Sequence, residues 1–281
     1  MALNQHLSQQ KGLNSKMFSW TIYFYSLVTI GIFALWGWLL SLARNNVTHV
    51  DSMWSLFFGL AAYTTALFVL FNNPLSSRVA IVLTLITIWA LRLFIYLTWR
   101  NWGPHEDSRY VAIRANNEPN FWFKSIYIVF GLQAMLAWII SISLYGAIAG
   151  NAAFNLLDYA GCALILIGFY WEFVADWQLS RFKANPSHKG SVLNTGLWRY
   201  SRHPNYFGEC LVWWGFYTIA VAAGAWWAII SPVLMTLLLL KVSGVSLLES
   251  TIVERRPAYA QYIKNTNAFV PGFTKKLYSK D

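Results

Sequence analysis

The chain has 281 residues, of which 57% are hydrophobic and 18% aromatic, while only 11% are charged. Average soluble proteins carry about 25% charged residues, so this composition is typical of a membrane protein. The formal net charge of +10 does not indicate nucleic-acid binding, because the basic residues are confined to short segments between long apolar runs, as in the flanks of membrane helices.

Long apolar runs predict seven membrane-spanning helices, because about 20 apolar residues are needed to cross a bilayer. The predicted spans are 18–42, 53–71, 79–99, 121–148, 154–177, 206–222 and 225–245. The first run is longer than a signal-peptide core of roughly 7 to 15 residues, so we expect a retained anchor. A mixed apolar and charged pattern predicts an amphipathic helix at 246–264. The sequence therefore predicts an all-α polytopic protein, with residues 1–281 forming a single integral membrane domain.

The distribution of basic residues predicts the orientation in the membrane. With seven spans, one side holds the loops after the first, third and fifth spans and the C-terminus, and 17 of the 21 Lys and Arg residues lie there. We therefore expect the N-terminus outside and the C-terminus in the cytosol, although Lys11 and Lys16 favour the opposite orientation of the first span. The long polar loops 100–120 and 178–205 would then place the functional site on the cytosolic side of the cell membrane, or of the inner membrane in a bacterium.

Charged side chains near the centre of a span cost a few kcal/mol each and usually mark function. Asp51 lies just before the second span, and Trp89, Arg92, Tyr96 and Arg100 share one face of the third. At ~1.5 Å of rise per residue, Arg92 lies about 12 Å of helix from Arg100, too deep to be a flanking residue. It therefore needs an internal partner.

Three carboxylates are candidates for that partner: Glu172 and Asp176 in the fifth span and Glu209 in the sixth. Glu172 and Asp176 are four residues apart and therefore share a helix face. A pair between Arg92 and Glu172 alone would equally fit a contact that only fixes helix packing. Contacts that also include Asp176 and Glu209 would indicate the wall of a charged pocket.

Residues 199–209 form a dense polar stretch, Arg-Tyr-Ser-Arg-His-Pro-Asn-Tyr-Phe-Gly-Glu. Pro204 predicts the start of a helix. The basic residues before it lie where the free N–H groups of that helix point, which favours an anion such as a phosphate. Basic residues also flank membrane helices without further function, but the amide of Asn205 and the carboxylate of Glu209 are not needed for topology.

Other motifs exclude several kinds of site. Cys162 and Cys210 lie in apolar segments without CxxC or His spacing, so neither a disulfide framework nor a zinc site is indicated. The sequence has no GxGxxG after a predicted strand, no P-loop and no HExxH. A nucleotide would therefore be held by a membrane-embedded pocket and not by a Rossmann domain.

Several segments together resemble the bacterial branch of the steroid 5-alpha-reductase-like membrane proteins, labelled by domain of unknown function 1295. The resemblance covers about Asp51 to Pro271, and the matching segments are 106–110, 176–183, 190, 196–209 and 255–271. The Arg-His-Pro-x-Tyr-x-Gly core is also present in isoprenylcysteine and phospholipid methyltransferases. An S-adenosylmethionine-dependent membrane methyltransferase of the isoprenylcysteine type is therefore the alternative function. A transporter is a further alternative, although inverted halves and broken helices are not visible.

The resemblance implies an oxidoreductase of lipid metabolism that binds NADPH and reduces a carbon–carbon double bond conjugated to a ketone, as in a 3-oxo-4-ene steroid. Its catalytic residues would be Asp51, Tyr96 and Trp89. Trp89 stands where the steroid reductases have a tyrosine that hydrogen-bonds the ketone. An indole N–H polarises a carbonyl but has no useful proton to give, so Asp51 or Tyr96 would act as the acid. Asp51 in apolar surroundings would stay protonated for this purpose.

The resemblance and the charge pattern also imply where the cofactor binds. The expected cofactor-binding residues are Arg92, Arg100, Asn101, Asp107, Arg109, Tyr110, Asp176, Arg181, Lys183, Arg199, Tyr200, Arg202, His203, Asn205, Tyr206, Glu209, Arg255 and Arg256. A site this basic favours NADPH over NADH. The other expected partners are membrane lipid and a lipophilic small-molecule substrate that enters from the bilayer.

Overall fold

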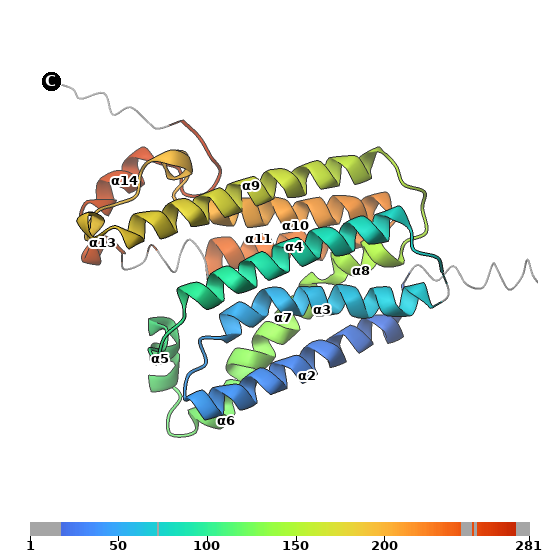
Figure 1. The fold of residues 1–281 in the computed structure, drawn as a ribbon, viewed down its shortest axis with the longest axis horizontal. Coiled ribbons are helices and arrows are strands. Elements are labelled where there is room, and N and C mark those ends of the chain that lie inside the picture. The colour runs from blue at the N-terminus through green and yellow to red at the C-terminus, as the bar shows by residue number, and fades with distance from the viewer. Residues whose placement is uncertain (1–17, 72, 243–248, 250–251, 274–281) are drawn as a thin grey trace, which may run out of the picture. The chain divides into compact units, whose positions relative to one another are not determined.

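The structure, a computed structural model, describes residues 18–71, 73–242, 249 and 252–273. In these ranges every regular element is a helix (Figure 1), which confirms the predicted all-α class. The chain divides into two compact units. The first unit comprises Met1–Asn155 and Ala220–Ala228, and the second unit comprises Leu156–Ile219 and Ile229–Asp281. The division runs through helix α10 (Pro204–Ala222). That residues 1–281 form a single integral membrane domain stays a prediction.

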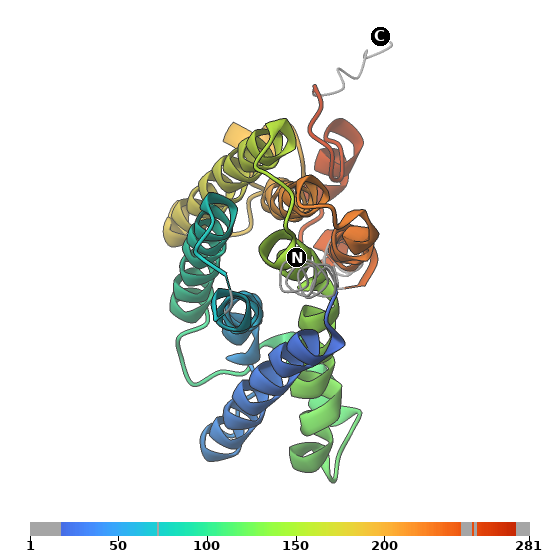
Figure 2. The same cartoon turned by 90° about the vertical axis from the view of Figure 1, so that its right-hand side faces the viewer.

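Three long helices begin the first unit: α2 (Trp20–Arg44), α3 (Val50–Leu70) and α4 (Ser77–Arg100). Ser19 and Ser76 cap α2 and α4, because each side-chain oxygen accepts a hydrogen bond from a backbone N–H of the first turn, at 3.5 and 3.3 Å. Asn45 ends α2 with a left-handed φ of 47°. α3 packs against both other helices, and Figures 1 and 2 show the three side by side.

The first unit continues after the loop that follows α4. It contains α5 (Ser108–Ala115), α6 (Phe121–Ser125), a π-helical turn (Ile126–Gly131), α7 (Leu132–Ile140) and α8 (Ile142–Ala149). The wide π-helical turn ends at Gly131, where an added Cβ atom would lie 2.9 Å from the carbonyl oxygen of Ile126. Glycine is therefore the residue that fits this turn without a clash.

The second unit is built on a long helix, α9, and on α10. Its elements are α9 (Leu156–Ala184), short 3₁₀ turns (Pro186–His188 and Gly196–Arg199), α10, α11 (Ile230–Leu237), a π-helical turn (Leu238–Val242), α13 (Ile252–Arg255) and α14 (Tyr259–Asn265). α10 begins at Pro204, as predicted, because the fixed φ of proline suits the first position of a helix.

Five helical segments are long and apolar enough to cross a membrane, which is consistent with a multi-pass membrane protein. They are Trp20–Arg44, Val50–Leu70, Ser77–Arg100, Phe121–Ala149 and Leu156–Ala184. The other two predicted spans coincide with α10 and with the shorter apolar segment Trp226–Lys241. At ~1.5 Å per residue the latter is about 24 Å long, less than the ~30 Å hydrocarbon core. The total of seven spans stays a prediction.

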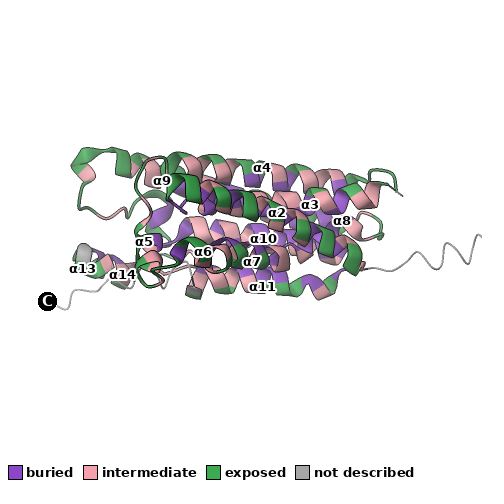
Figure 3. Cartoon of the chain, turned by 90° about the horizontal axis from the view of Figure 1, so that it is seen from below, coloured by how far each residue is buried: buried purple, intermediate pink, exposed green. Residues whose placement is uncertain are grey.

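Large apolar side chains on the outside of α2 are in keeping with a lipid environment. Trp20, Phe24, Ile32, Leu35 and Leu39 are each at least half exposed, and Figure 3 shows exposed residues along this helix. Soluble monomers rarely expose a contiguous apolar surface of this kind. The surface of α2 therefore suits contact with hydrocarbon chains better than contact with water.

The C-terminal region differs from the predicted amphipathic helix at 246–264. Residues 246–248 and 250–251 lie outside the described residues. Over 252–264 the prediction of a single continuous helix is wrong, because α13 ends at Arg255 and α14 begins at Tyr259. Pro257 lies between them, and a proline removes a backbone donor and clashes with the preceding turn in a helix interior.

α9 and α10 approach each other closely at two pairs of glycines. A Cβ atom added to Gly168 would lie 2.6 Å from the carbonyl oxygen of Gly208, and one added to Gly161 would lie 2.8 Å from that of Gly215. Such distances leave no room for a side chain unless a backbone moves. Small residues at these four positions therefore allow the two helices to pack backbone against backbone.

We expect Gly208→Ala to lower the free energy of unfolding by about 1–3 kcal/mol, because the added methyl group overpacks against the backbone of α9. Gly31→Ala in α2 is the matched control, since nothing lies within 4 Å of its added Cβ and replacing a helical glycine by alanine is neutral or stabilising by up to about 1 kcal/mol. Unfolding in detergent, followed by circular dichroism, measures both. Equal stability of the two variants would contradict the close approach.

Candidate functional site

The first unit brings acidic, basic and hydroxyl side chains together at the start of α3 and around α5. Asp51 lies in the first turn of α3, and each of its carboxylate oxygens has its own partner. Arg109 Nη2 lies 2.6 Å from Asp51 Oδ2, and the hydroxyl of Tyr110 donates a 2.5 Å hydrogen bond to Oδ1. Three of the predicted site residues are thus in direct contact.

Asp107 holds Arg109 from a second side and also starts α5. Its Oδ1 accepts hydrogen bonds from the backbone N–H and from Nε of Arg109, both at 2.9 Å, and the first of these caps the helix. The N–H of Asp107 donates to Thr48 Oγ1 at 2.9 Å, which ties α5 to the turn before α3. Burial raises the pKa of the Asp107 carboxyl, but the hydrogen bonds from Arg109 outweigh it and lower the pKa below its usual value. Arg109 therefore lies between two carboxylates.

A second ion pair fixes the same loop. Arg114 Nε and Nη2 donate to the two carboxylate oxygens of Glu106, both at 2.8 Å, in a bidentate arrangement. Glu106 Oε1 also accepts a 2.9 Å hydrogen bond from the N–H of Val47. The Arg114 guanidinium lies 4.4 Å from the centroid of the Phe121 ring. These contacts hold α5 and the loop before it against the turn between α2 and α3 and against α6.

Tyr110 has one further partner, which sequence reasoning missed. Gln133 Nε2 in α7 donates a 3.1 Å hydrogen bond to the Tyr110 hydroxyl. A single amide within the apolar run 121–148 was the available signal, because polar groups at that depth usually have an internal partner. Burial and the negative charge of Asp51 raise the pKa of the Tyr110 hydroxyl. This hydroxyl therefore stays protonated while it donates to Asp51.

The predicted polar face of α4 carries a phenol ring between two cations. The Arg92 and Arg100 guanidinium groups lie 5.2 and 5.7 Å from the centroid of the Tyr96 ring. Arg100 Nε also donates a 3.1 Å hydrogen bond to Asn101 Oδ1. Cations over an aromatic face are attracted by the ring quadrupole. The Tyr96 ring therefore holds these two arginines along one side of α4.

The three residues predicted to act on a substrate ketone, Trp89, Asp51 and Tyr96, have different surroundings in the structure. Trp89 is fully buried and meets Phe58 edge to face, with ring centroids 5.7 Å apart, so core residues surround its indole. Both carboxylate oxygens of Asp51 already have partners, one in Arg109 and the other in Tyr110. Tyr96 is half-buried beside two cations. Of the three, Tyr96 has the surroundings that best suit a donor.

The second unit brings the end of α9 to the start of α10. Asn205 Nδ2 donates a 3.1 Å hydrogen bond to Asp176 Oδ1, so these two predicted site residues are in contact. Asp176 and Glu172, one turn earlier, are both buried. Gln178 Oε1 accepts a 3.0 Å hydrogen bond from the N–H of Leu197. These two contacts attach the segment before α10 to the polar end of α9.

Arg202 and His203 bind a carboxylate that sequence reasoning missed. Arg202 Nε and Nη2 donate to Glu249 at 2.6 and 2.8 Å, and His203 Nε2 lies 3.0 Å from Glu249 Oε1. Arg202 Nη1 donates to the carbonyl oxygens of Ile263 and Thr266 at 3.1 and 2.5 Å. Burial alone would raise the pKa of the Glu249 carboxyl, but hydrogen bonds from His203 and Arg202 lower that pKa to about 2. This arrangement gives Arg202 a structural role, and its contact with a cofactor phosphate stays a prediction.

The remaining basic residues of the predicted site lie on separate elements of the second unit. Arg181 and Lys183 are exposed in the last turn of α9, and Arg181 lies 5.6 Å from the centroid of an indole ring on the same helix. Arg256 Nη1 donates a 2.9 Å hydrogen bond to the carbonyl oxygen of Ser191. The side chain of Arg255 lies outside the described part of the chain. The structure therefore brings Arg256 to the loop that precedes α10.

The remaining predicted residues border the start of α10. The Tyr206 ring stacks on His203 with centroids 5.6 Å apart and an angle of 5° between the ring planes. Tyr200 is exposed, and its carbonyl oxygen accepts a 2.9 Å hydrogen bond from the N–H of Gly272. Glu209 is half-buried in the second turn of α10. The Tyr206 ring therefore packs on the same histidine that holds Glu249.

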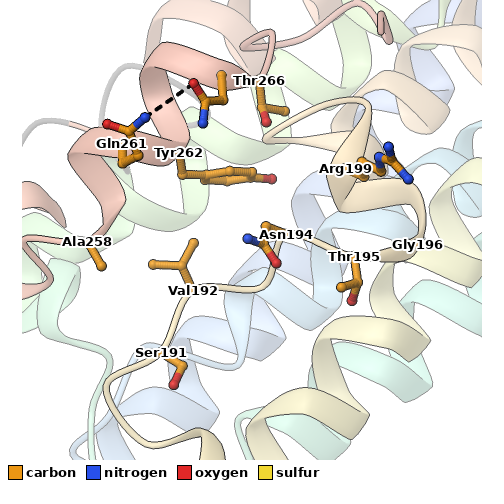
Figure 4. Close-up of a pocket in the computed structure, with 11 residues that line it drawn as sticks. Ser191, Val192, Asn194, Thr195, Gly196, Arg199, Ala258, Gln261, Tyr262 and Thr266 are labelled. Carbon is orange, nitrogen blue, oxygen red and sulfur yellow. Dashed lines mark hydrogen bonds between the residues drawn. The ribbon is translucent and has the colours of Figure 1, made fainter. Parts of the chain in front are cut away.

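A pocket of about 830 Å³ opens between the loop 191–199 and α14 (Figure 4). It is lined by Ser191, Val192, Asn194, Thr195, Gly196, Arg199, Ala258, Gln261, Tyr262, Asn265 and Thr266. Figure 4 shows Tyr262 extending from α14 toward the loop, where its hydroxyl donates to the carbonyl oxygens of Trp198 and Ser201. One guanidinium group with several hydroxyl and amide groups suits a polar ligand with negative charge.

Comparisons with known proteins agree with the sequence pattern. The family described as "Protein of unknown function (DUF1295)" matches residues 37–266, a range that includes every residue predicted for the site. The chain is also similar to "Uncharacterized protein C594.04c" of Schizosaccharomyces pombe, with 28% identity over 84% of this chain and 75% of that protein. No solved structure matches the chain.

We expect Tyr110→Phe to lower the free energy of unfolding by about 1–3 kcal/mol, because it leaves the half-buried Gln133 amide without its acceptor and Asp51 without one donor. Tyr127→Phe is the matched control, since this tyrosine is about half exposed and surface substitutions usually change stability by less than about 0.5 kcal/mol. Denaturant titration in detergent compares the two variants. An unchanged midpoint for Tyr110→Phe would contradict the network.

We expect the contribution of Glu249 to stability to depend on pH. Its pKa is about 2 in the folded chain and 4.5 without the fold, so the contribution is fully present above pH 4.5 and is lost as the pH falls toward 2. Glu249→Gln should therefore lower the Tm at neutral pH, and this difference from the unchanged protein should shrink below pH 4.5. Glu254→Gln, on an exposed side chain of α13, is the control. A difference that does not vary with pH would refute the ion pair.

Proposed function

The chain belongs to the family of proteins of unknown function DUF1295, and from this premise we propose that it is an NADPH-dependent reductase. The proposed substrate is lipophilic and steroid-like, with a carbon–carbon double bond conjugated to a ketone, as in 3-oxo-4-ene steroids. The resemblance to the steroid 5-alpha-reductase-like membrane proteins supports this reaction. The five apolar helical segments support a substrate that partitions into lipid.

The observation that carries the proposal is the pocket around Arg199 in the second unit. Its volume of about 830 Å³ lies within the ~300–1,000 Å³ range of cofactor and ligand sites. The side chains of Ser191, Asn194, Thr195, Gln261 and Asn265 offer hydroxyl and amide groups that match the riboses and carboxamide of a dinucleotide. Arg199 offers a guanidinium group that matches a phosphate. This donor set fits NADPH.

The chemistry of the chain's own residues fits the reduction of an enone. Bound NADPH would supply a hydride, after which negative charge develops on the carbonyl oxygen of the substrate. A donor aimed at that oxygen lowers the barrier. Within the first unit, the residue that best matches such a donor is Tyr96, because Arg92 and Arg100 beside its ring would stabilise the developing charge. We assign Asp51 to positioning, since it holds Arg109 and Tyr110 in place.

The proposal includes the membrane topology. We propose seven spans, with α10 and Trp226–Lys241 completing the five longer ones, the N-terminus outside and the C-terminus in the cytosol. The distribution of lysine and arginine supports this orientation. The polar pocket around Arg199 would then face the cytosol, where NADPH is available, and the substrate would enter from the bilayer.

We expect purified protein in detergent to bind NADPH more tightly than NADH, and Arg199→Gln to weaken NADPH binding about tenfold, the loss of one charge-assisted contact. Lys264→Gln is the matched control, because Lys264 is an exposed cation on α14 that does not line the pocket. The affinities are obtained by measuring the thermal stability of each protein at increasing concentrations of NADPH or NADH. A panel of enones then tests for loss of the reduced nicotinamide absorbance together with loss of the conjugated double bond.

Two outcomes would contradict the proposal. One is the absence of NADPH binding between about 1 μM and 1 mM, the usual range for enzyme substrates. The other is stabilisation by S-adenosylmethionine in place of NADPH, which would favour the methyltransferase alternative. If Arg199→Gln and Lys264→Gln lower the affinity equally, NADPH binds but the assigned pocket is wrong.

A further inference from the structure

A second cavity lies within the first unit, between the C-terminal half of α2, the start of α3 and the end of α4. Its volume is about 310 Å³. Much of its lining is apolar and includes Phe33 and Leu40 of α2, Leu56 of α3 and Phe94 of α4. At ~30 Å³ per water molecule the volume equals about ten waters, which is room for about ten methylene groups of one hydrocarbon chain and not for both chains of a two-chain lipid.

Two polar atoms at this cavity favour a ligand that accepts hydrogen bonds. Thr98 Oγ1 and Asn101 Nδ2 are buried and have no hydrogen-bond partner within the described ranges, and both residues line the cavity. Arg100 Nε donates to Asn101 Oδ1 at 3.1 Å, which leaves the amide N–H₂ group of Asn101 as a donor. Buried donors are normally satisfied. A ligand oxygen that accepts from both side chains would satisfy them.

The charge around the cavity favours an anionic group on that ligand. Arg44, in the last turn of α2, lines the cavity, and among the described residues that line it there is no aspartate or glutamate. Trp36 and Trp102 also line it and are 55% and 77% exposed. Tryptophan is enriched at the level of lipid headgroups. A lipid whose headgroup lies at this level would place its chain among the apolar residues of the cavity.

We propose that this cavity binds a single-chain lipid with an anionic oxygen headgroup, such as a long-chain fatty acid. The headgroup would bind Arg44, Thr98 and Asn101, and the chain would lie between α2, α3 and α4. The same chemistry is offered by the carboxylate of a fatty acid and by the phosphate of a lysophospholipid. The site is separate from the proposed reduction, because neither lipid carries an enone.

The test uses full-length protein, purified in detergent and stripped of lipid, with a radiolabelled long-chain fatty acid as the probe. We expect saturable binding, and about tenfold weaker competition by the alcohol of equal chain length, which lacks the charge. A lysophospholipid with a free phosphate is the second competitor. Stronger competition by the lysophospholipid than by unlabelled fatty acid would assign the site to a phosphate headgroup, and weaker competition would assign it to a carboxylate.

Variants locate the bound lipid in this cavity. Leu56→Trp fills the cavity and should abolish binding, whereas Leu67→Trp, on the exposed face of the same helix, should not.

Thr98→Val should weaken binding about fivefold, and Thr84→Val, an exposed threonine of α4, is its control. Thr98→Val removes an unsatisfied buried hydroxyl, so the lipid-free variant should be no less stable than the unchanged protein, which separates lost binding from misfolding. Equal binding of acid and alcohol, or equal effects of Leu56→Trp and Leu67→Trp, would overturn the proposal.

Discussion

The structure depends on the compensation of positive charge at the ends of apolar helices. Arg109 lies between Asp51 and Asp107, and Arg202 donates to Glu249 and to two carbonyl oxygens. A largely buried guanidinium group such as that of Arg202 would cost several kcal/mol without such partners. Asp107 is a local partner of Arg109, but the other contacts join segments that are far apart in the sequence, so the charges that need partners also fix where the loops lie.

In the second unit, backbone geometry as well as charge shapes the polar segment that leads into α10. Gly196 has a left-handed φ of 59°, and an added Cβ atom would collide with the side chain of Gln178. Gln178 in turn accepts a hydrogen bond from Leu197, and Asp176 accepts one from Asn205. The residues before α10 are therefore held by the polar end of α9, which gives the pocket around Arg199 a fixed wall.

The sequence was enough to predict the all-α class and several of the long helices, but not the partners of the charges. Apolar runs predicted α4 at 79–99, and the helix extends over Ser77–Arg100, because the need to bury or shield apolar side chains is a local signal. Pro257 also signalled the break between α13 and α14, although a continuous helix was expected. Glu249 is 47 residues from Arg202, and only the fold decides which carboxylate meets which arginine.

The same contacts separate two uses of arginine that composition alone does not distinguish. Arg109, Arg114 and Arg202 each donate to a carboxylate at 2.6–2.8 Å, so much of their hydrogen-bonding capacity serves the fold. Arg199 and Arg44 line cavities whose other walls offer hydroxyl and amide groups. Replacing an arginine that holds a carboxylate should change stability, and replacing one that lines a cavity should also change the affinity for a ligand. A run of basic residues such as 199–203 therefore contains Arg202, which holds a carboxylate from a distant segment, and Arg199, which lines a pocket.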